Sequence, residues 1–171
     1  MKQEYVIERI GAGDITNCKG NRRFNLRTAA LIVHQSQILV MRDTRTPYFY
    51  LPGGRVRHGE TTEEAIKREI MEELGLNLKI EYLAWIAESF FTEDASRECF
   101  HEIGFYYVVD GKTESLLERG DTFEFSEKNG SLLSFSWMPF EKVPKAYIYP
   151  AFIKKRIMEI PESTEHIVEL E

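Results

Sequence analysis

The sequence predicts an α/β fold, a mixed β-sheet with helices on its faces, from three observations. Several runs are rich in the aromatic and β-branched residues that are enriched in β-strands. One central segment has apolar residues at helical spacing between a helix start signal and a stop signal. A second segment with helical spacing follows residue 150. Strands with interspersed helices are typical of a sheet packed against helices.

The whole chain, residues 1–171, has the size and composition of a single domain. Its residues are 43% hydrophobic and 29% charged, which is enough apolar surface for one buried core. The formal net charge of −6 argues against a protein whose main task is to neutralise nucleic-acid phosphates. Cys18 and Cys99 lie far apart without Cys or His at metal-ligand spacing, so neither a disulfide scaffold nor a zinc site is indicated.

We expect a cytoplasmic protein that does not enter a membrane. The N-terminal residues MKQEYVIERI alternate charged and apolar side chains and lack the long apolar core of a signal peptide. The apolar runs TAALIV and ILVM are too short to span a bilayer.

The first elements follow from local patterns. Residues 26–41 form two apolar, β-rich runs separated by the polar residues HQSQ, which predicts a hairpin or a closely spaced strand pair. Residues 48–54, YFYLPGG, predict a short aromatic strand that stops at Pro52. Gly53 and Gly54 then predict a loop whose backbone can adopt positive φ and approach a ligand closely.

A helix is predicted to begin after Thr61 and to end at Gly75. Thr61 precedes Glu64 by three residues, which is the spacing of a capping box, and glycine is common just after a helix. The apolar residues of this helix form one stripe that would face the sheet: Ile66, Ile70 and Leu74.

The second half of the chain predicts at least three more strands and one helix. The strands are LKIEYLAWIAESFF, CFHEIGFYYVVD and SLLSFSWMPF. The polar residues 110–130 predict a long loop or a loose hairpin. The last helix is predicted to begin near Pro150, with apolar residues at helical spacing up to Ile160.

Two glutamates of the central helix have no cation at helical spacing. The positions three and four residues away from Glu69 and Glu73 hold no Lys or Arg, whereas Glu72 can pair with Arg68. Like charges four residues apart cost about 0.2–0.5 kcal/mol, and acidic groups in a last turn oppose the helix dipole by roughly 0.3–1 kcal/mol. We therefore expect a compensating group from outside the helix.

A divalent cation is one such group. Glu69, Glu72 and Glu73 fall within about one third of the helix circumference, beside a glycine loop that can offer a backbone carbonyl. An all-oxygen set of this kind suits Mg²⁺ or Mn²⁺ rather than zinc or copper. The competing interpretation is a solvated acidic helix face, which fits Glu72 better because Glu72 has a basic partner.

The stretch PGGRVRHGETTEEAIKREIMEELGL resembles the signature of the Nudix hydrolases. That signature is G, five residues, E, seven residues, REU, one residue, EE, one residue and GU, where U is aliphatic. Residues 54–76 match every fixed position: Gly54, Glu60, Arg68, Glu69, Ile70, Glu72, Glu73, Gly75 and Leu76. The order of the predicted elements around the signature is also similar to that of the family.

The resemblance implies an α/β/α sandwich with a central mixed β-sheet. It also implies Mg²⁺-dependent (or Mn²⁺-dependent) hydrolysis of the pyrophosphate bond in a nucleoside diphosphate linked to another group. Its implied metal ligands are Glu69, Glu72, Glu73 and the Gly54 carbonyl. A bound cation would neutralise charge on the phosphate oxygens and lower the pKa of the attacking water.

The resemblance further implies roles for the remaining box residues. Glu69 or Glu73 would act as general base, and Arg68 with Glu60 would support them by orienting the carboxylates. Some family members draw the base from a later segment. Three residues are candidates for that distal base or for a further ligand, each against the simpler interpretation of a surface glutamate: Glu127, Glu124 and Glu102.

The substrate stays open among nucleotide sugars, ADP-ribose-like compounds and nucleoside triphosphates. Aromatic rings stack on nucleobases and arginines bind phosphate, although aromatic residues in strands more often belong to the core. Four residues are our candidates for substrate binding: Arg27, Arg42, Phe90 and Phe91.

Two other functions compete with this one. Non-catalytic nucleotide-binding regulators on the same fold usually lose box carboxylates, all of which are present here. RNA-end processing is disfavoured by the net acidity of the chain and by the lack of a basic tail. The expected partner is therefore a small nucleotide rather than nucleic acid, and the aromatic strands would permit a homodimer.

Overall fold

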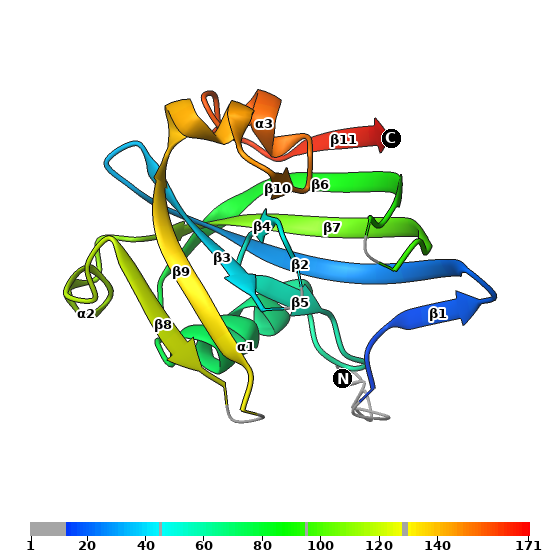
Figure 1. Cartoon of the computed structure of the whole chain (residues 1–171), viewed down its shortest axis with the longest axis horizontal. Helices are drawn as coiled ribbons and strands as arrows, with labels where there is room; N and C mark the ends of the chain where they lie inside the picture. The colour runs from blue at the N-terminus through cyan, green and yellow to red at the C-terminus, as the bar shows by residue number, and fades with distance from the viewer. Residues whose placement is uncertain (1–12, 45, 95, 128–129) are drawn as a thin grey trace, which may run out of the picture.

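The computed structural model describes residues 13–44, 46–94, 96–127 and 130–171, and it holds a mixed β-sheet with few helices (Figure 1). The N-terminal residues MKQEYVIERI, whose pattern argues against a signal peptide, lie outside the described residues. Within the described part, no helix is long and apolar enough to cross a membrane. The elements are β1 (Thr16–Lys19), β2 (Arg22–His34), β3 (Gln37–Asp43), β4 (Phe49–Tyr50), β5 (Gly53–Arg55), α1 (Thr62–Leu74), β6 (Ile80–Thr92), β7 (Cys99–Asp110), α2 (Glu114–Leu117), β8 (Thr122–Ser126), β9 (Leu132–Pro139), the 3₁₀ helix η1 (Phe140–Lys145), β10 (Ile148–Tyr149), α3 (Ile153–Arg156) and β11 (Glu165–Leu170).

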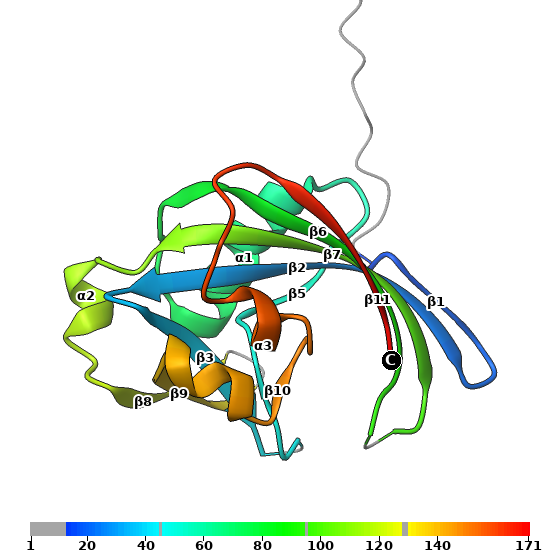
Figure 2. The same cartoon turned by 90° about the horizontal axis from the view of Figure 1, so that it is seen from above.

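The sheet combines parallel and antiparallel pairs around β2. Its main order is β10-β4-β3-β2-β7-β6-β11, and β1 and β5 also pair with β2. β2 runs parallel to β7 and antiparallel to β3, while β6 runs antiparallel to β7 and parallel to β11. In Figure 2 the strands β2, β7, β6 and β11 lie side by side and curve together. The predicted mixed sheet is therefore confirmed.

The predicted hairpin after residue 26 is confirmed. β2 and β3 are joined by Gln35 and Ser36, with φ values of 47° and 59°. Positive φ at both central residues is typical of the tight hairpin turn whose twist matches that of the strands. The turn places β2 in the middle of the sheet, where residues 29–32 are all buried.

The sheet has an apolar core on each face. Alternate residues of β2 point to opposite faces, so Leu31 packs with residues of η1 and α3, and Ile32 packs with α1. Figure 1 shows α1 on one side of the sheet and α3 on the other. This layering agrees with the expected sandwich, although the layer that contains α3 holds only short helices.

The central helix begins and ends as predicted. Thr61 accepts a hydrogen bond from the backbone N–H of Glu64 at 3.1 Å, and the Glu64 carboxylate accepts one from the Thr61 N–H at 2.8 Å. This reciprocal pair is the predicted capping box. Gly75 has a φ of 65° and donates to the Met71 carbonyl at 3.0 Å, which closes the helix.

The structure differs from the sequence predictions at several elements. The C-terminal helix does not extend to Ile160, because α3 spans only four residues and Pro161 follows. β11 was not predicted, although buried Ile167 between exposed neighbours has the period of an edge strand. Of the two alternatives for residues 110–130, the hairpin is closer to the structure, since β8 pairs antiparallel with β9, and α2 precedes it.

Candidate active site

Gly53 and Gly54, which the sequence predicted as a loop, instead begin the short strand β5, which pairs with β2 and continues into the loop before α1. Gly53 has a φ of 141°, and a Cβ at this position would overlap the Thr28 carbonyl of β2. A Cβ at Gly54 would overlap the carboxylate of Glu69 on α1. Gly53 is therefore required by the backbone of β2, whereas a side chain at Gly54 would displace the Glu69 carboxylate. The close approach places the Glu69 carboxylate against the backbone of β5.

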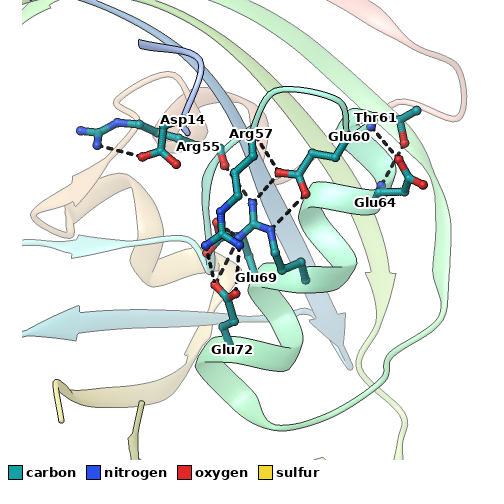
Figure 3. Close-up of polar contacts among 9 residues, drawn as sticks. Asp14, Arg55, Arg57, Glu60, Thr61, Glu64, Glu69 and Glu72 are labelled. Carbon is teal, nitrogen blue, oxygen red and sulfur yellow. Dashed lines mark hydrogen bonds and ion pairs between the residues drawn. The ribbon is translucent and has the colours of Figure 1, made fainter. Parts of the chain in front are cut away.

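One guanidinium joins this loop to three glutamates. Arg68 donates to both carboxylate oxygens of Glu60, at 2.6 and 3.0 Å, and to the Arg55 carbonyl at 3.0 Å. Its Nη1 donates to Glu69 at 2.6 Å and to Glu72 at 3.1 Å. Figure 3 shows Glu60, Glu69 and Glu72 close together, and each of the three accepts a hydrogen bond from the Arg68 guanidinium. The Glu69 and Glu72 carboxylates therefore share one nitrogen atom as their partner.

Glu60 also holds the loop in place. Its carboxylate accepts a hydrogen bond from the Arg57 backbone N–H at 2.7 Å, and the Arg57 guanidinium lies 3.4 Å from Glu72 (Figure 3). This geometry suits the orienting role predicted for Arg68 and Glu60, and their part in catalysis stays a prediction. Glu72 faces these two arginines, and its role as a metal ligand also stays a prediction.

The expectation that Glu69 has no cationic partner is wrong. Arg68 precedes Glu69 directly and still reaches its carboxylate at 2.6 Å. Neighbours on a helix normally point in different directions, but the long Arg68 side chain turns toward the loop and brings its guanidinium back over Glu69. Helical spacing alone does not capture such a contact.

Glu73 lies deeper than the other box carboxylates. Its exposed fraction is 7%, and its Oε2 accepts a hydrogen bond from the Gly53 N–H at 2.8 Å. Burial raises the pKa of Glu73 well above the ordinary carboxyl value, and the nearby charge of Glu69 raises it further. Glu127, one of the predicted distal residues, also lies close enough to Glu73 to raise this pKa.

The donor set fits a divalent cation. Burial raises the pKa of Glu69, although Arg68 opposes the rise, so the half-buried Glu69 and the buried Glu73 are two carboxylates that a positive charge would stabilise. Their oxygens are the ligands that hard cations prefer. Across the residues that the structure describes, no three acidic, His or Cys side chains already converge as a metal site. Arg68 occupies the position between Glu69 and Glu72 instead.

A cavity of about 790 Å³ opens beside this cluster. Of the predicted residues, Glu73, Arg27, Phe91 and Glu102 line it. Arg27 donates to the Gly53 carbonyl at 3.2 Å, next to the hydrogen bond that Gly53 donates to Glu73. The cavity therefore connects the buried carboxylate of α1 with the open face of the sheet.

The other predicted residues lie outside the cavity lining. Arg42 stands over the Phe49 ring at 5.4 Å, and the Phe90 ring stacks on His101 with 4.3 Å between centroids. Glu124 lies on the exposed side of β8. These positions give no support to a role for Arg42 or Phe90 in substrate binding, or for Glu124 as the base.

The structure adds lining residues that the sequence patterns did not single out: Ser89, Tyr106, Tyr149 and Glu169. Each belongs to a strand and looks like an ordinary strand residue in the sequence. Only the register of the sheet brings these side chains together with Glu102 and Asn25.

Comparison with known proteins gives a consistent family match. The model of the family described as NUDIX domain matches residues 24–158. A curated protein of Bacillus subtilis (strain 168), provisionally named an 8-oxo-dGTP diphosphatase, is 48% identical over 48 residues, which are 28% of this chain and 32% of that protein. An ADP-ribose pyrophosphatase of Methanocaldococcus jannaschii is 42% identical over 62 residues, 34% of this chain and 37% of that protein. The matches thus span about a third of these relatives.

Solved structures show the same fold. The crystal structure of a MutT NUDIX hydrolase from Burkholderia pseudomallei superposes with a TM-score of 0.56 at 21% sequence identity. The superposition covers 81% of this chain and 98% of that chain. At this level of identity the likeness concerns the fold.

Proposed function

This chain belongs to the NUDIX domain family, and from that premise we propose that it is a pyrophosphohydrolase that depends on Mg²⁺ or Mn²⁺. Its proposed substrate is a nucleoside diphosphate linked to another group, cleaved at the pyrophosphate bond. We also propose that residues 1–171 form one domain and that the protein acts on small nucleotides in the cytoplasm.

The buried position of Glu73 is the observation that carries this proposal. Its carboxylate lines the cavity, beside Glu69 and against the Gly53 N–H. A buried carboxylate beside the half-buried carboxylate of Glu69 destabilises a metal-free protein, because the charge of each favours the neutral form of the other, and Arg68 pairs with Glu69 alone of the two. Pairs of carboxylates with raised pKa values are typical of functional sites, where they bind a cation or transfer a proton.

The residues proposed to hold the cation are Glu69, Glu72, Glu73 and the Gly54 carbonyl. When bound, the cation would offset negative charge on the diphosphate oxygens and make the attacking water more acidic. Arg68 supports this arrangement because it already positions Glu69 and Glu72 within hydrogen-bond distance of one nitrogen. The Glu60 carboxylate in turn fixes Arg68 through two bonds.

For proton transfer we favour Glu73 over Glu69. Glu73 lines the cavity, where an attacking water could reach it, whereas Glu69 accepts a short hydrogen bond from Arg68. The pKa of Glu73 is raised by burial, which makes its carboxylate a better proton acceptor near neutral pH. Glu127 and Glu102, which lie near Glu73 and on the cavity wall respectively, stay as the alternatives.

Arg27 is our candidate for contact with the phosphate groups. Its side chain lines the cavity and attracts the charges of Glu73 and Glu69. One of its guanidinium nitrogens donates to the Gly53 carbonyl, which holds the group beside the carboxylate pair. A guanidinium at this point can form ion pairs with the diphosphate whose hydrolysis we assign to the carboxylates and the cation.

The test is a hydrolysis assay with Mg²⁺ over a panel of ADP-ribose, nucleotide sugars, nucleoside triphosphates and dinucleotides. We expect one class of compound to release phosphate after phosphatase treatment. This release should disappear when EDTA is added, and its rate should be reduced at least 100-fold in Glu73→Gln. Glu118→Gln, on the exposed end of α2, is the matched control. Tight nucleotide binding without turnover would instead indicate a non-catalytic regulator.

A further inference from the structure

The floor of the cavity contains a polar row that crosses four strands. Asn25 on β2 is paired with Glu102 on β7, Glu102 with Ser89 on β6, and Ser89 with Glu169 on β11. All four side chains line the cavity. Because paired residues on adjacent strands lie on the same face of a sheet, the row forms one continuous polar surface.

Two hydroxyl groups on this floor have no hydrogen-bond partner among the described residues. Ser89 is 5% exposed and Tyr106 is 2% exposed, and both line the cavity. Neither hydroxyl oxygen is among the buried side-chain atoms without a partner, which in the described residues are His34 Nδ1 and Trp85 Nε1, so both oxygens reach the cavity. Hydroxyls that face a cavity without a protein partner can exchange their hydrogen bonds to water for bonds to polar atoms of a ligand.

The carboxylates of the row leave acceptor capacity for a ligand. Glu102 accepts a hydrogen bond from the Asn25 amide at 3.3 Å through one oxygen, and Glu169 accepts one from the Phe152 backbone. A carboxylate has room for about four such bonds. Burial raises the pKa of Glu169 and also that of the Tyr106 hydroxyl, which therefore stays a donor.

The charge of the cavity wall restricts what can bind next to this row. Among the described lining residues, carboxylates outnumber guanidiniums seven to two. One of the two guanidiniums, Arg55, is already held by Asn25 at 3.1 Å and by Asp14 at 3.4 Å. Arg27 lies beside Glu73 instead. A second phosphate or carboxylate group at the polar row would face like charges, and the described lining residues offer no further cation to pair with it.

Aromatic rings flank the row on its outer side. Phe100 is paired with Phe91, and their rings stack 5.0 Å apart at an interplanar angle of 4°. Both line the cavity. On the inner side, Arg27 lies two residues from Asn25 along β2, a separation of about 7 Å. The row therefore lies between an aromatic wall and the place proposed for the diphosphate.

We propose that this row, with the Tyr106 hydroxyl, binds an uncharged sugar of the substrate through its hydroxyl groups. Sugar hydroxyls both donate and accept, which matches Ser89 and Tyr106, and their donors match the acceptors of Glu102 and Glu169. The same chemistry could belong to the ribose of the nucleoside or to a terminal sugar beyond the diphosphate. The proposal rests on the proposed function and names the substrate class of that site.

Matched pairs of substrates test the charge requirement. UDP-glucose and UDP-glucuronate differ only at the terminal sugar, where a hydroxymethyl group is replaced by a carboxylate. NADH and NADPH differ only by a phosphate on the adenosine ribose. We expect KM for the neutral member of at least one pair to be about 10-fold lower or more, because like charges at one site are strongly unfavourable. The pair that discriminates identifies which sugar occupies the row.

Substitutions test which residues bind the sugar. Ser89→Ala and Tyr106→Phe should raise KM for the neutral compound about 3- to 10-fold, as expected for a lost neutral hydrogen bond, with kcat nearly unchanged. Glu102→Gln should reduce the discrimination between the two members of the pair. Glu118→Gln is the control and should leave both quantities as in the unmodified protein.

Equal KM values within both pairs, or a lower KM for the anionic members, would overturn the proposal. So would Ser89→Ala and Tyr106→Phe proteins whose KM does not change. If none of the four compounds is hydrolysed, the proposed function loses support independently, and calorimetric titration with the same compounds decides the sugar site. Selective binding of the neutral members supports it, whereas equal or absent binding refutes it.

Discussion

Arg68 binds both carboxylate oxygens of Glu60, at 2.6 and 3.0 Å, across eight positions of the chain. The side chains are only 18% and 13% exposed. This planar, two-point contact connects the middle of α1 to the loop that precedes the helix. The same guanidinium also reaches Glu69 and Glu72, so the position of the loop and the position of the carboxylates depend on one side chain.

Replacing Arg68 should therefore affect stability and activity together. In Arg68→Lys the charge remains, but an ammonium cannot form the same fork with a carboxylate. We expect a loss of about 1–3 kcal/mol in the free energy of unfolding, together with a fall in kcat of at least 10-fold. Urea unfolding and the hydrolysis assay measure the two effects. Lys67→Gln breaks an exposed pair with Glu63 on the same helix and should change either quantity little.

Gly54→Ala tests the close contact between the loop and α1. The new Cβ would overlap the Glu69 carboxylate, which must then move. Because a displacement of about 1 Å at a reacting centre can cost roughly 100-fold in rate, we expect kcat to fall by that order while the protein stays folded. In Gly13→Ala nothing lies within 4 Å of the added Cβ, so that protein should retain its activity. Unchanged kcat in Gly54→Ala would show that Glu69 need not occupy its present position.

Glu73 should make the stability of the metal-free protein depend on pH. Its pKa is raised by burial above the ordinary carboxyl value of 4.5, so the folded state holds this proton more tightly than the unfolded state. The resulting stability is fully present below pH 4.5 and is lost as pH rises through the raised pKa. The Tm of the unmodified protein should therefore fall relative to that of Glu73→Gln over this range.

Mg²⁺ should reverse this difference at neutral pH. Because a ligand that binds only the folded state raises its stability, Mg²⁺ should raise the Tm of the unmodified protein more than that of Glu73→Gln. Thermal melts in EDTA and in Mg²⁺ measure both effects. A Tm difference that stays constant with pH in EDTA would show that Glu73 is not held in a protonated form.

Thr61→Ala should lower stability without altering the site. The substitution removes the side-chain acceptor of the capping box, which costs about 1 kcal/mol. For a domain of this size that corresponds to a fall in Tm of roughly 2–4 °C. Thr61→Ser retains the hydroxyl and should melt close to the unmodified protein. A large change in kcat/KM for Thr61→Ala would mean that the cap also positions the carboxylates.

The sequence determined the features that depend on near neighbours in the chain. The capping box of Thr61, the helix end at Gly75 and the turn at Gln35 and Ser36 each involve residues within a few positions of one another. Local hydrogen bonding and backbone sterics control such elements, so their patterns are visible before the chain folds. The box signature, spread over 23 residues, also led directly to the family that the comparisons show.

Only the tertiary structure decided which side chains meet. Phe90 and Phe91 are adjacent in β6, yet one stacks on His101 outside the cavity lining and the other lines the cavity, because successive strand residues point to opposite faces. The row of Asn25, Glu102, Ser89 and Glu169 depends on the register of four strands that are far apart in sequence. Register is set by packing of the whole sheet, so no local pattern could have assembled this row.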